Sequence, residues 1–189
     1  MSGREVRAVL LGAPGSGKGT QAERLSASLG VPAISTGELL RQAVATGSNL
    51  GSRVAATLAS GRLVDDALMA DLVRDRLDQP DAGGGFLLDG YPRTPSQAET
   101  LAELLEGRGK RLDAVVLLEV PEEVLVRRAL ARRREDDRDE VIRERLRIFR
   151  EKTEPLVGFY ERLGLLVRID GNRPLVEVTD CALAALRRN

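Results

Sequence analysis

The chain of 189 residues contains no histidine and only one cysteine, Cys181. Without histidine, imidazole base catalysis and zinc sites with histidine ligands are excluded, so catalysis has to use lysine, arginine and carboxylate side chains. A single cysteine cannot form a disulfide within the chain. Cys181 follows Val178 and precedes Leu186 in the last helical stretch, and this position predicts a small, buried hydrophobic side chain.

Long apolar runs are also missing. No stretch is long enough to span a bilayer, and residues 1–7 lack the charged-then-apolar order of a signal peptide. We therefore expect a cytoplasmic protein with no membrane partner. Basic and acidic residues number 29 each, so no net charge attracts nucleic acid, and none is expected as a partner. The composition, 42% apolar and 31% charged, is that of one main globular domain.

Short apolar runs alternate with helical patterns along the chain. This alternation predicts an α/β fold, a doubly wound parallel sheet of five strands covered by helices. Pro155 falls inside the helical stretch 139–163 and is expected to bend it. The last helix is expected to bury Leu175, Val178 and Leu186. The expected strands are 6–11, 33–34, 86–88, 114–120 and 165–169.

A glycine-rich motif follows the first of these strands directly, and residues 12–20 read GAPGSGKGT. A strand, a glycine turn and a helix start in this order aim several backbone N–H groups and the positive end of the helix dipole at one point. Lys18 adds a charge that can reach the terminal phosphates of a nucleotide. The motif therefore predicts a phosphate cradle and a fold of the P-loop NTPase type.

One position of the motif differs from the usual pattern. Gly19 stands where a serine or threonine normally follows the lysine, and Thr20 comes one residue later. Because that hydroxyl usually helps to hold Mg²⁺, the ion here has to depend on phosphates, water and another carboxylate. Asp89 ends an expected strand, where ligands collect in this fold, and we expect it to hold Mg²⁺ through water. Arg93 should face the same crevice.

Four motifs resemble those of the adenylate kinase family in order and spacing. They are GAPGSGKGT at 12–20, ISTGELLR at 34–41, LLDGYPR at 87–93 followed by Gln97, and R-x-D-D at 134–137. The resemblance covers nearly the whole chain. It implies a nucleoside monophosphate kinase that transfers the terminal phosphoryl group of MgATP to AMP, with ATP, AMP and ADP as partners.

The resemblance also implies a core with two moving parts. Residues 36–64 correspond to a small helical AMP-binding subdomain and 131–138 to a short lid, while 1–35, 65–130 and 139–189 form the core. The lid segment has no cysteine, so no structural zinc is expected there. A monomer is expected from the same resemblance.

On the AMP side, the resemblance places Thr36 and Gln97 at the adenine and Arg41 and Arg93 at the phosphate. Gln97 has a second interpretation as the capping-box partner of Thr94, and Thr36 as a residue that only starts a helix. The residues expected around AMP are Thr36, Arg41, Arg62, Leu63, Val64, Gly90, Tyr91, Pro92, Arg93, Gln97, Arg134 and Arg145.

On the ATP side, the resemblance places Arg128 over the adenine, Arg132 on the phosphates and the Arg173 backbone near the base edge. Arg134 and Arg145 would hold the phosphoryl group during transfer. The residues expected around ATP are Gly15, Ser16, Gly17, Lys18, Gly19, Thr20, Arg128, Arg132 and Arg173. The expected catalytic residues are Lys18, Arg93, Arg132, Arg134 and Arg145.

Two other functions stay open on the sequence. UMP/CMP kinases resemble the chain throughout, but they tend to have alanine at the position of Thr36 and asparagine at that of Gln97, so both positions favour AMP. A nucleotide-dependent RNA-binding or regulatory module would use the lid arginines to hold a nucleic-acid backbone. The balanced charge and the lack of a basic, aromatic-rich face argue against that alternative.

Overall fold

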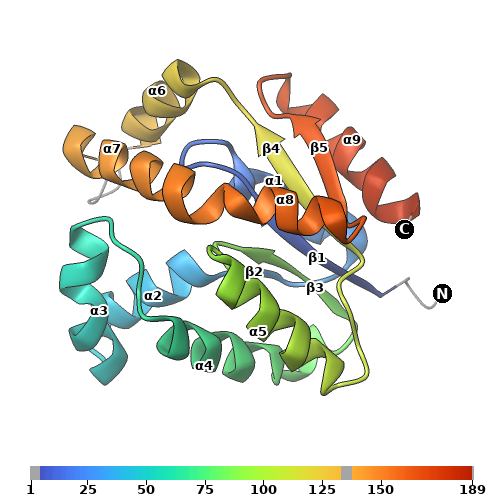
Figure 1. The fold of residues 1–189 in the computed structure, drawn as a ribbon, viewed down its shortest axis with the longest axis horizontal. Coiled ribbons are helices and arrows are strands. Elements are labelled where there is room, and N and C mark those ends of the chain that lie inside the picture. The colour runs from blue at the N-terminus through green and yellow to red at the C-terminus, as the bar shows by residue number, and fades with distance from the viewer. Residues whose placement is uncertain (1–4, 133–137, 189) are drawn as a thin grey trace.

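The computed structural model describes residues 5–132 and 138–188. One parallel sheet lies between two layers of helices (Figure 1). The strand order is β2-β3-β1-β4-β5, so the predicted five-stranded, doubly wound α/β sheet is confirmed. The strands are β1 (Val6–Leu11), β2 (Ala33–Ser35), β3 (Gly85–Asp89), β4 (Ala114–Glu119) and β5 (Leu166–Asp170).

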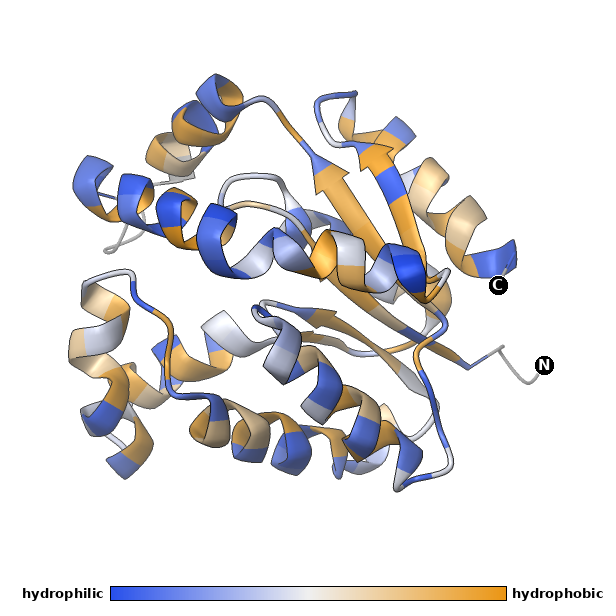
Figure 2. Cartoon of the chain, in the orientation of Figure 1, coloured by the Kyte–Doolittle hydropathy of each residue, from blue (hydrophilic) through white to orange (hydrophobic). Residues whose placement is uncertain are grey.

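Alternate residues of the central strands point into two separate cores. Val9 and Val115 pack in the core beneath α4 (Asp66–Leu77), α5 (Pro95–Glu106) and α8 (Pro155–Arg162). Leu10 and Val116 pack in the core beneath α1 (Lys18–Leu29) and α9 (Leu175–Arg188). Because both faces are covered, the strands are apolar along most of their length, as Figure 2 shows.

Two pairs of helices lie beyond the carboxyl ends of the strands (Figure 1). One pair consists of α2 (Thr36–Ala45) and α3 (Asn49–Ala59), and the other of α6 (Glu122–Arg132) and α7 (Asp139–Ile148). Ser35 and Ser48 cap α2 and α3, because their side-chain oxygens accept hydrogen bonds from the N–H groups of Glu38 and Gly51. The two pairs therefore stand on the side where a doubly wound sheet binds its ligands.

The helical stretch expected at 139–163 is interrupted at the proline. After α7, a π-helical turn spans Phe149–Thr153, and α8 begins at Pro155. Pro155 has no N–H to donate to the preceding turn, so a regular helix cannot continue through it. The wider turn includes a 2.8 Å hydrogen bond from the N–H of Glu154 to the carbonyl of Phe149.

Two predictions for the last helix are wrong. Cys181 is exposed, and Leu175 keeps 45% of its surface in contact with solvent. The buried apolar stripe of α9 consists of Val178, Ala182 and Leu186, which recur every four residues, and Thr179 is buried beside it. Cys181 lies beside this stripe, and Leu175 begins the helix. Within the described ranges, the helices are too short or too polar to cross a membrane.

Candidate nucleotide site

A cleft of about 740 Å³ lies at the carboxyl ends of β1, β2 and β3. The glycine-rich turn lines one part of it, and α2 with the turn at 61–64 lines another. Residues of α6, α7 and the π-helical turn also line it, together with single side chains of other helices. Segments far apart in the sequence, including both helix pairs, therefore share one cavity.

The glycine-rich turn packs against α6 and leads directly into α1. Gly15 has φ +86°, and a β-carbon there would lie 2.4 Å from the Leu125 carbonyl oxygen, so only glycine fits. Gly17 also has a left-handed conformation and precedes α1, which starts without a side-chain cap or an acidic residue in its first turn. This end of α1 can therefore present its N–H groups and positive dipole to an anion.

The Lys18 ammonium folds back over the same turn. Its Nζ donates to the carbonyl oxygens of Gly12 at 2.7 Å and Ala13 at 3.1 Å. These bonds hold the charge at the mouth of the turn, and Lys18 lines the cleft. A phosphate bound there would meet the ammonium and the start of α1 together.

Asp89 faces the position where the missing hydroxyl of the motif would stand. A β-carbon at Gly19 would lie 3.8 Å from Oδ2 of Asp89, and both residues line the cleft. Among the described residues, no group of three or more acidic, cysteine or histidine side chains could hold a metal ion. A single carboxylate beside a phosphate cradle fits Mg²⁺, which usually keeps several waters and binds substrate phosphates.

The pKa of Arg93 is influenced by several other charged groups of the cleft. Its Nε donates to the Gly90 carbonyl at 2.8 Å, which fixes the direction of the half-buried guanidinium. Burial lowers the pKa of Arg93, the Asp89 carboxylate opposes this shift, and Arg145 and Arg41 add to it. Three guanidinium groups and one carboxylate thus act on one another, and a polyanion would relieve the repulsion among the cations.

Thr36 and Gln97 are buried in the wall of the cleft. The Thr36 hydroxyl lies 3.4 Å from the carbonyl oxygen of Asp89, so it joins the start of α2 to the end of β3. The backbone N–H of Gln97 donates to the Thr94 hydroxyl at 3.2 Å, as the capping interpretation predicts. The Gln97 amide turns elsewhere, toward Asp66 and the backbone of Arg93.

The turn at 61–64 brings the α2–α3 pair against α7. Gly61 has φ +74°, and a β-carbon there would lie 3.1 Å from Cγ1 of Val141 and 3.2 Å from Cγ of Arg145. Arg62, Leu63 and Val64 follow and line the cleft. On the same wall, Arg41 forms a 2.7 Å ion pair with Glu38.

Arg128 and Arg145 reach the cleft from α6 and α7. The guanidinium of Arg128 donates to the carbonyl oxygen of Gly171 at 3.0 Å and so connects α6 with the segment between β5 and α9. The side chain of Arg145 is half-buried, and its positive charge lowers the pKa of Arg93.

Several expected residues do not line the cleft. The Ser16 hydroxyl is buried and has no hydrogen-bond partner among the described residues. Tyr91 is buried in the core beneath α4 and α5, where burial and the nearby Asp66 carboxylate raise its pKa to about 12. Arg173 is exposed, and its Nε lies 3.5 Å from Oδ2 of Asp170. Arg134 and the side chain of Arg132 lie outside the described residues.

Other lining residues were not expected from the sequence. Ile148, Phe149 and Thr153 reach the cleft from the π-helical turn and its edge, and the break at Pro155 was the one signal that pointed to this region. Arg76 lines the cleft from α4 while both its terminal nitrogens bind Asp81 at 2.8 Å. Nothing in its spacing distinguishes it from the other arginines of the chain.

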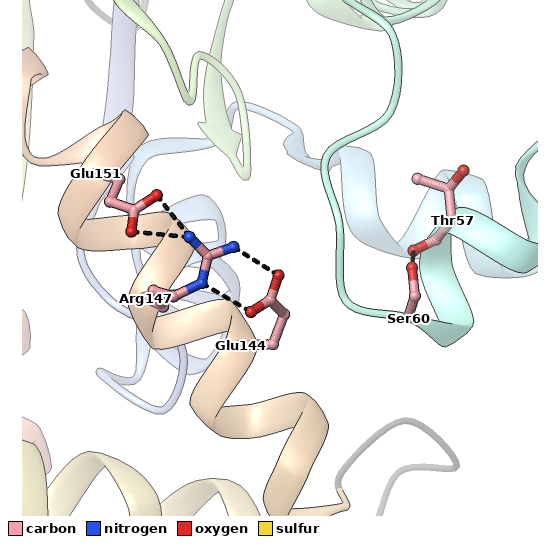
Figure 3. Close-up of polar contacts among 5 residues, drawn as sticks. All are labelled: Thr57, Ser60, Glu144, Arg147 and Glu151. Carbon is pink, nitrogen blue, oxygen red and sulfur yellow. Dashed lines mark hydrogen bonds and ion pairs between the residues drawn. The ribbon is translucent and has the colours of Figure 1, made fainter.

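An ion network lies on the surface of α7 and the π-helical turn. Figure 3 shows Arg147 between Glu144 and Glu151, which hold it through four hydrogen bonds of 2.7–2.9 Å. All three side chains are within two turns of Arg145. Figure 3 also shows Thr57 and Ser60 at the end of α3, where the Ser60 hydroxyl donates to the Thr57 carbonyl at 2.9 Å.

Comparison with known proteins gives one consistent family. The family model described as adenylate kinase matches residues 10–165. An adenylate kinase of Thermobifida fusca is 48% identical over 186 residues, covering 96% of this chain and 98% of the relative. One of Xanthomonas euvesicatoria is 49% identical over 187 residues, covering 97% and 100%. One of Kosmotoga olearia is 42% identical over 203 residues, covering 91% and 94%.

Proposed function

The chain belongs to the adenylate kinase family, and we propose which of its residues bind MgATP, which bind AMP and which act in the transfer between them. The reaction is that of a nucleoside monophosphate kinase, in which the terminal phosphoryl group of MgATP moves to AMP and leaves two ADP. The observation that carries the assignment is the shared cleft, which joins the phosphate cradle to a second set of arginines.

The ATP side is the wall formed by the glycine-rich turn and α6. Residues 15–20 surround the phosphates with backbone N–H groups, and the Lys18 ammonium neutralises part of their charge. Arg128 stacks on the adenine from α6, a role that its place in the cleft lining supports. The roles of Arg132 on the phosphates and of the Arg173 backbone at the base edge stay predictions from the resemblance.

The AMP side is the wall formed by α2, the turn at 61–64 and the segment after β3. Thr36 and Gln97 contact the adenine, and Arg41 and Arg93 bind the phosphate. The turn residues Arg62, Leu63 and Val64, together with Gly90 and Pro92, complete this wall, and a role of Tyr91 at AMP stays a prediction from the resemblance. The burial of Thr36 and Gln97 in the cleft lining supports their assignment to the base.

Transfer takes place between these walls, where Arg93 and Arg145 approach each other. An in-line phosphoryl transfer needs alignment and neutralisation of charge more than a general base, which suits a site without histidine. Arg93, Arg145 and Lys18 hold the negative charge of the transferred group, and Arg134 adds a further cation. Arg145 and Arg41 lower the pKa of Arg93, and such repulsion among neighbouring cations favours a highly charged anionic ligand.

Mg²⁺ accompanies ATP, and Asp89 is the residue that would hold it through water. Bound there, Mg²⁺ would supply positive charge against the negative charge that develops on the phosphates. The Asp89 carboxylate supports this assignment, because it lies opposite Gly19, the residue that would otherwise supply a hydroxyl to the ion. No zinc is proposed.

Two segments move relative to the core in this proposal. Residues 36–64 form the AMP-binding subdomain and 131–138 the lid, with 1–35, 65–130 and 139–189 as the core. The contact of Gly61 with α7 supports a coupling between the subdomain and the helix that follows the lid. A monomeric state and a cytoplasmic location stay predictions.

An acceptor assay tests the proposal. With MgATP as the donor, we expect kcat/KM for AMP to exceed that for CMP, UMP and GMP by about tenfold or more, because Thr36 and Gln97 read the base. The measurement is the initial rate of ADP formation over a range of each monophosphate. Equal values for all four acceptors would contradict the base-reading roles of Thr36 and Gln97.

A further inference from the structure

Asp66 and Gln97 come from neighbouring helices and meet behind the wall of the cleft. Asp66 is the first residue of α4, and Gln97 lies in the first turn of α5, the helix next to α4 in Figure 1. Nε2 of Gln97 donates to Oδ1 of Asp66 at 2.7 Å. Gln97 lines the cleft and is 3% exposed, whereas Asp66 is exposed to solvent and lies outside the lining.

A second hydrogen bond holds the other end of the same amide. Oε1 of Gln97 accepts from the backbone N–H of Arg93 at 2.7 Å. A carboxylate can only accept hydrogen bonds and a backbone N–H can only donate, so the two contacts together determine which end of the amide is nitrogen. A flipped amide would set Oε1 against the Asp66 carboxylate and Nε2 against the Arg93 N–H.

The amide keeps one N–H and one oxygen lone pair for a ligand in the cleft. For a base that presents N1 to Nε2 and its 6-substituent to Oε1, this fixed pair complements a 6-aminopurine, which offers an acceptor at N1 and an N–H at its amino group. A 6-oxopurine offers the reverse pattern, an acceptor oxygen and an N1–H. Only a flipped Gln97 would match the 6-oxopurine, and a flip would give up the hydrogen bonds to Asp66 and Arg93 at a side chain that is 3% exposed.

We propose that Asp66 is a positioning residue which selects 6-aminopurine over 6-oxopurine monophosphates by fixing the amide orientation of Gln97. The inference rests on the proposed function, since it takes Gln97 as the residue that reads the base of the acceptor. Asp66 acts through Gln97 and has no contact with the nucleotide. Its acceptor-only chemistry is the essential property, and the negative charge strengthens the bond from the amide.

The test compares AMP with inosine monophosphate as acceptors, using MgATP and the full chain. Wild-type protein should have a large ratio of kcat/KM for AMP to that for inosine monophosphate. In Asp66→Ala, we expect this ratio to fall about tenfold or more, because one of the two bonds that prevent the flip is lost. The change should appear mainly as a higher KM for AMP and a lower KM for inosine monophosphate.

Asp66→Asn is the second variant, and it keeps the size and the polar character of the side chain. Its amide can offer either oxygen or nitrogen to Gln97, so the AMP preference should fall to a value between those of wild type and Asp66→Ala. This variant also tests the proposal if Asp66→Ala does not fold, as judged by circular dichroism.

Asp65→Ala is the matched control. Asp65 precedes Asp66, and its carboxylate caps α4 by accepting from the N–H of Leu68 at 3.1 Å. The control weakens the same helix start, so its melting temperature should fall, while the ratio of AMP to inosine monophosphate should stay near the wild-type value.

Two results would overturn the proposal. One is a ratio within about twofold of wild type in both Asp66 variants, which would be less than a single hydrogen bond contributes. The other is an equal fall of the ratio in Asp65→Ala, which would assign the effect to the start of the helix. Failure of the proposed function looks different, because wild-type protein would then show no preference for AMP over CMP, UMP or GMP.

Discussion

Gly19 and Asp89 face each other across the start of α1, with 3.8 Å between the position of a β-carbon at residue 19 and Oδ2 of Asp89. The residue after a P-loop lysine usually supplies a hydroxyl to Mg²⁺. This chain has a glycine there and a carboxylate opposite, on the end of β3. In the proposed site, the departure from the motif at Gly19 and the acid at Asp89 belong to one arrangement, in which the carboxylate would hold through water the metal that a hydroxyl usually helps to bind.

Asp89→Asn should therefore weaken the use of Mg²⁺. We expect kcat to fall about 10²- to 10³-fold, because a charge acting on the phosphoryl group and its metal is lost. The Mg²⁺ concentration that gives half of the maximal rate should rise as well. Both quantities follow from a magnesium titration of the initial rate at saturating ATP and AMP.

The double variant Gly19→Ser/Asp89→Asn tests whether residues 19 and 89 serve the same metal ion. A serine β-carbon has room at residue 19, since 3.8 Å is an ordinary van der Waals contact. Its hydroxyl should recover part of the affinity for Mg²⁺ that the single Asp89 variant loses. An unchanged magnesium requirement in Asp89→Asn alone would remove this carboxylate from the metal site.

The sheet and the phosphate cradle could be predicted from the sequence because local pattern determines both. A strand buried on both faces reads as a nearly continuous apolar run, a pattern that β1 shows apart from Arg7 and that β4 shows as far as Leu118. At Gly15, with φ > 0, a β-carbon would collide with a backbone carbonyl oxygen, so only glycine fits there. A requirement of this kind is visible in the sequence as a glycine. Such features need no knowledge of distant contacts.

Features that depend on long-range packing could not be predicted. Cys181 was expected to be buried because it is apolar, yet the orientation of α9 on the sheet decides which of its faces is covered. The break at Pro155 was predicted, but its form as a π-helical turn that brings Phe149 to the cleft was not. The bond from Gln97 to Asp66 joins residues 31 positions apart, so no local spacing indicates it.

Lys18→Met should abolish most of the turnover and leave the fold intact. The ammonium donates to two uncharged carbonyl oxygens of its own turn, and methionine keeps the length of the side chain without the charge. We expect kcat to fall about 10²- to 10³-fold, because the positive charge near the transferred group is lost. The assay is the initial rate at saturating substrates, with the melting temperature as the measure of folding. A kcat near the wild-type value would exclude the lysine from the mechanism.

Gly61→Ala should disturb the AMP side through the contact of the turn with α7. Alanine at φ +74° is strained by roughly 1–2 kcal/mol, and its β-carbon would press on Val141 and Arg145. The melting temperature should fall by a few degrees. In this variant we expect the turn at 61–64 to shift away from the cleft. KM for AMP should therefore rise about tenfold, while KM for ATP should change little.

Gly47→Ala is the control for this variant. Gly47 has φ +64° in the connection between α2 and α3, and a β-carbon there would meet no atom within 4 Å. The backbone strain is therefore similar, so the melting temperature should fall by a comparable amount, but KM for AMP should stay near the wild-type value. A similar rise of KM in both variants would attribute the effect to strain in the subdomain and not to the contact with α7.

Arg147→Met should lower stability in a way that depends on pH and salt. Hydrogen bonding to Arg147 and its positive charge lower the pKa of Glu144 below its ordinary value. A carboxylate with a lowered pKa in the folded state stabilises the protein above its unfolded pKa of about 4.3, and this contribution is lost as the pH falls through the folded value. The difference in melting temperature between wild type and variant should therefore be present at pH 7 and disappear toward pH 3.

The size of this effect should be modest, because the network is exposed. At pH 7 and low salt we expect the melting temperature to fall by about 1–3 °C, and kcat to stay within about twofold of wild type. Molar sodium chloride should remove most of the difference by screening. Arg143→Met is the control, since Arg143 pairs with Asp139 alone among the described residues, whereas Arg147 binds two carboxylates, so its own effect should be smaller. A difference that persists unchanged at pH 3 would show that Arg147 stabilises α7 through packing and not through its charge.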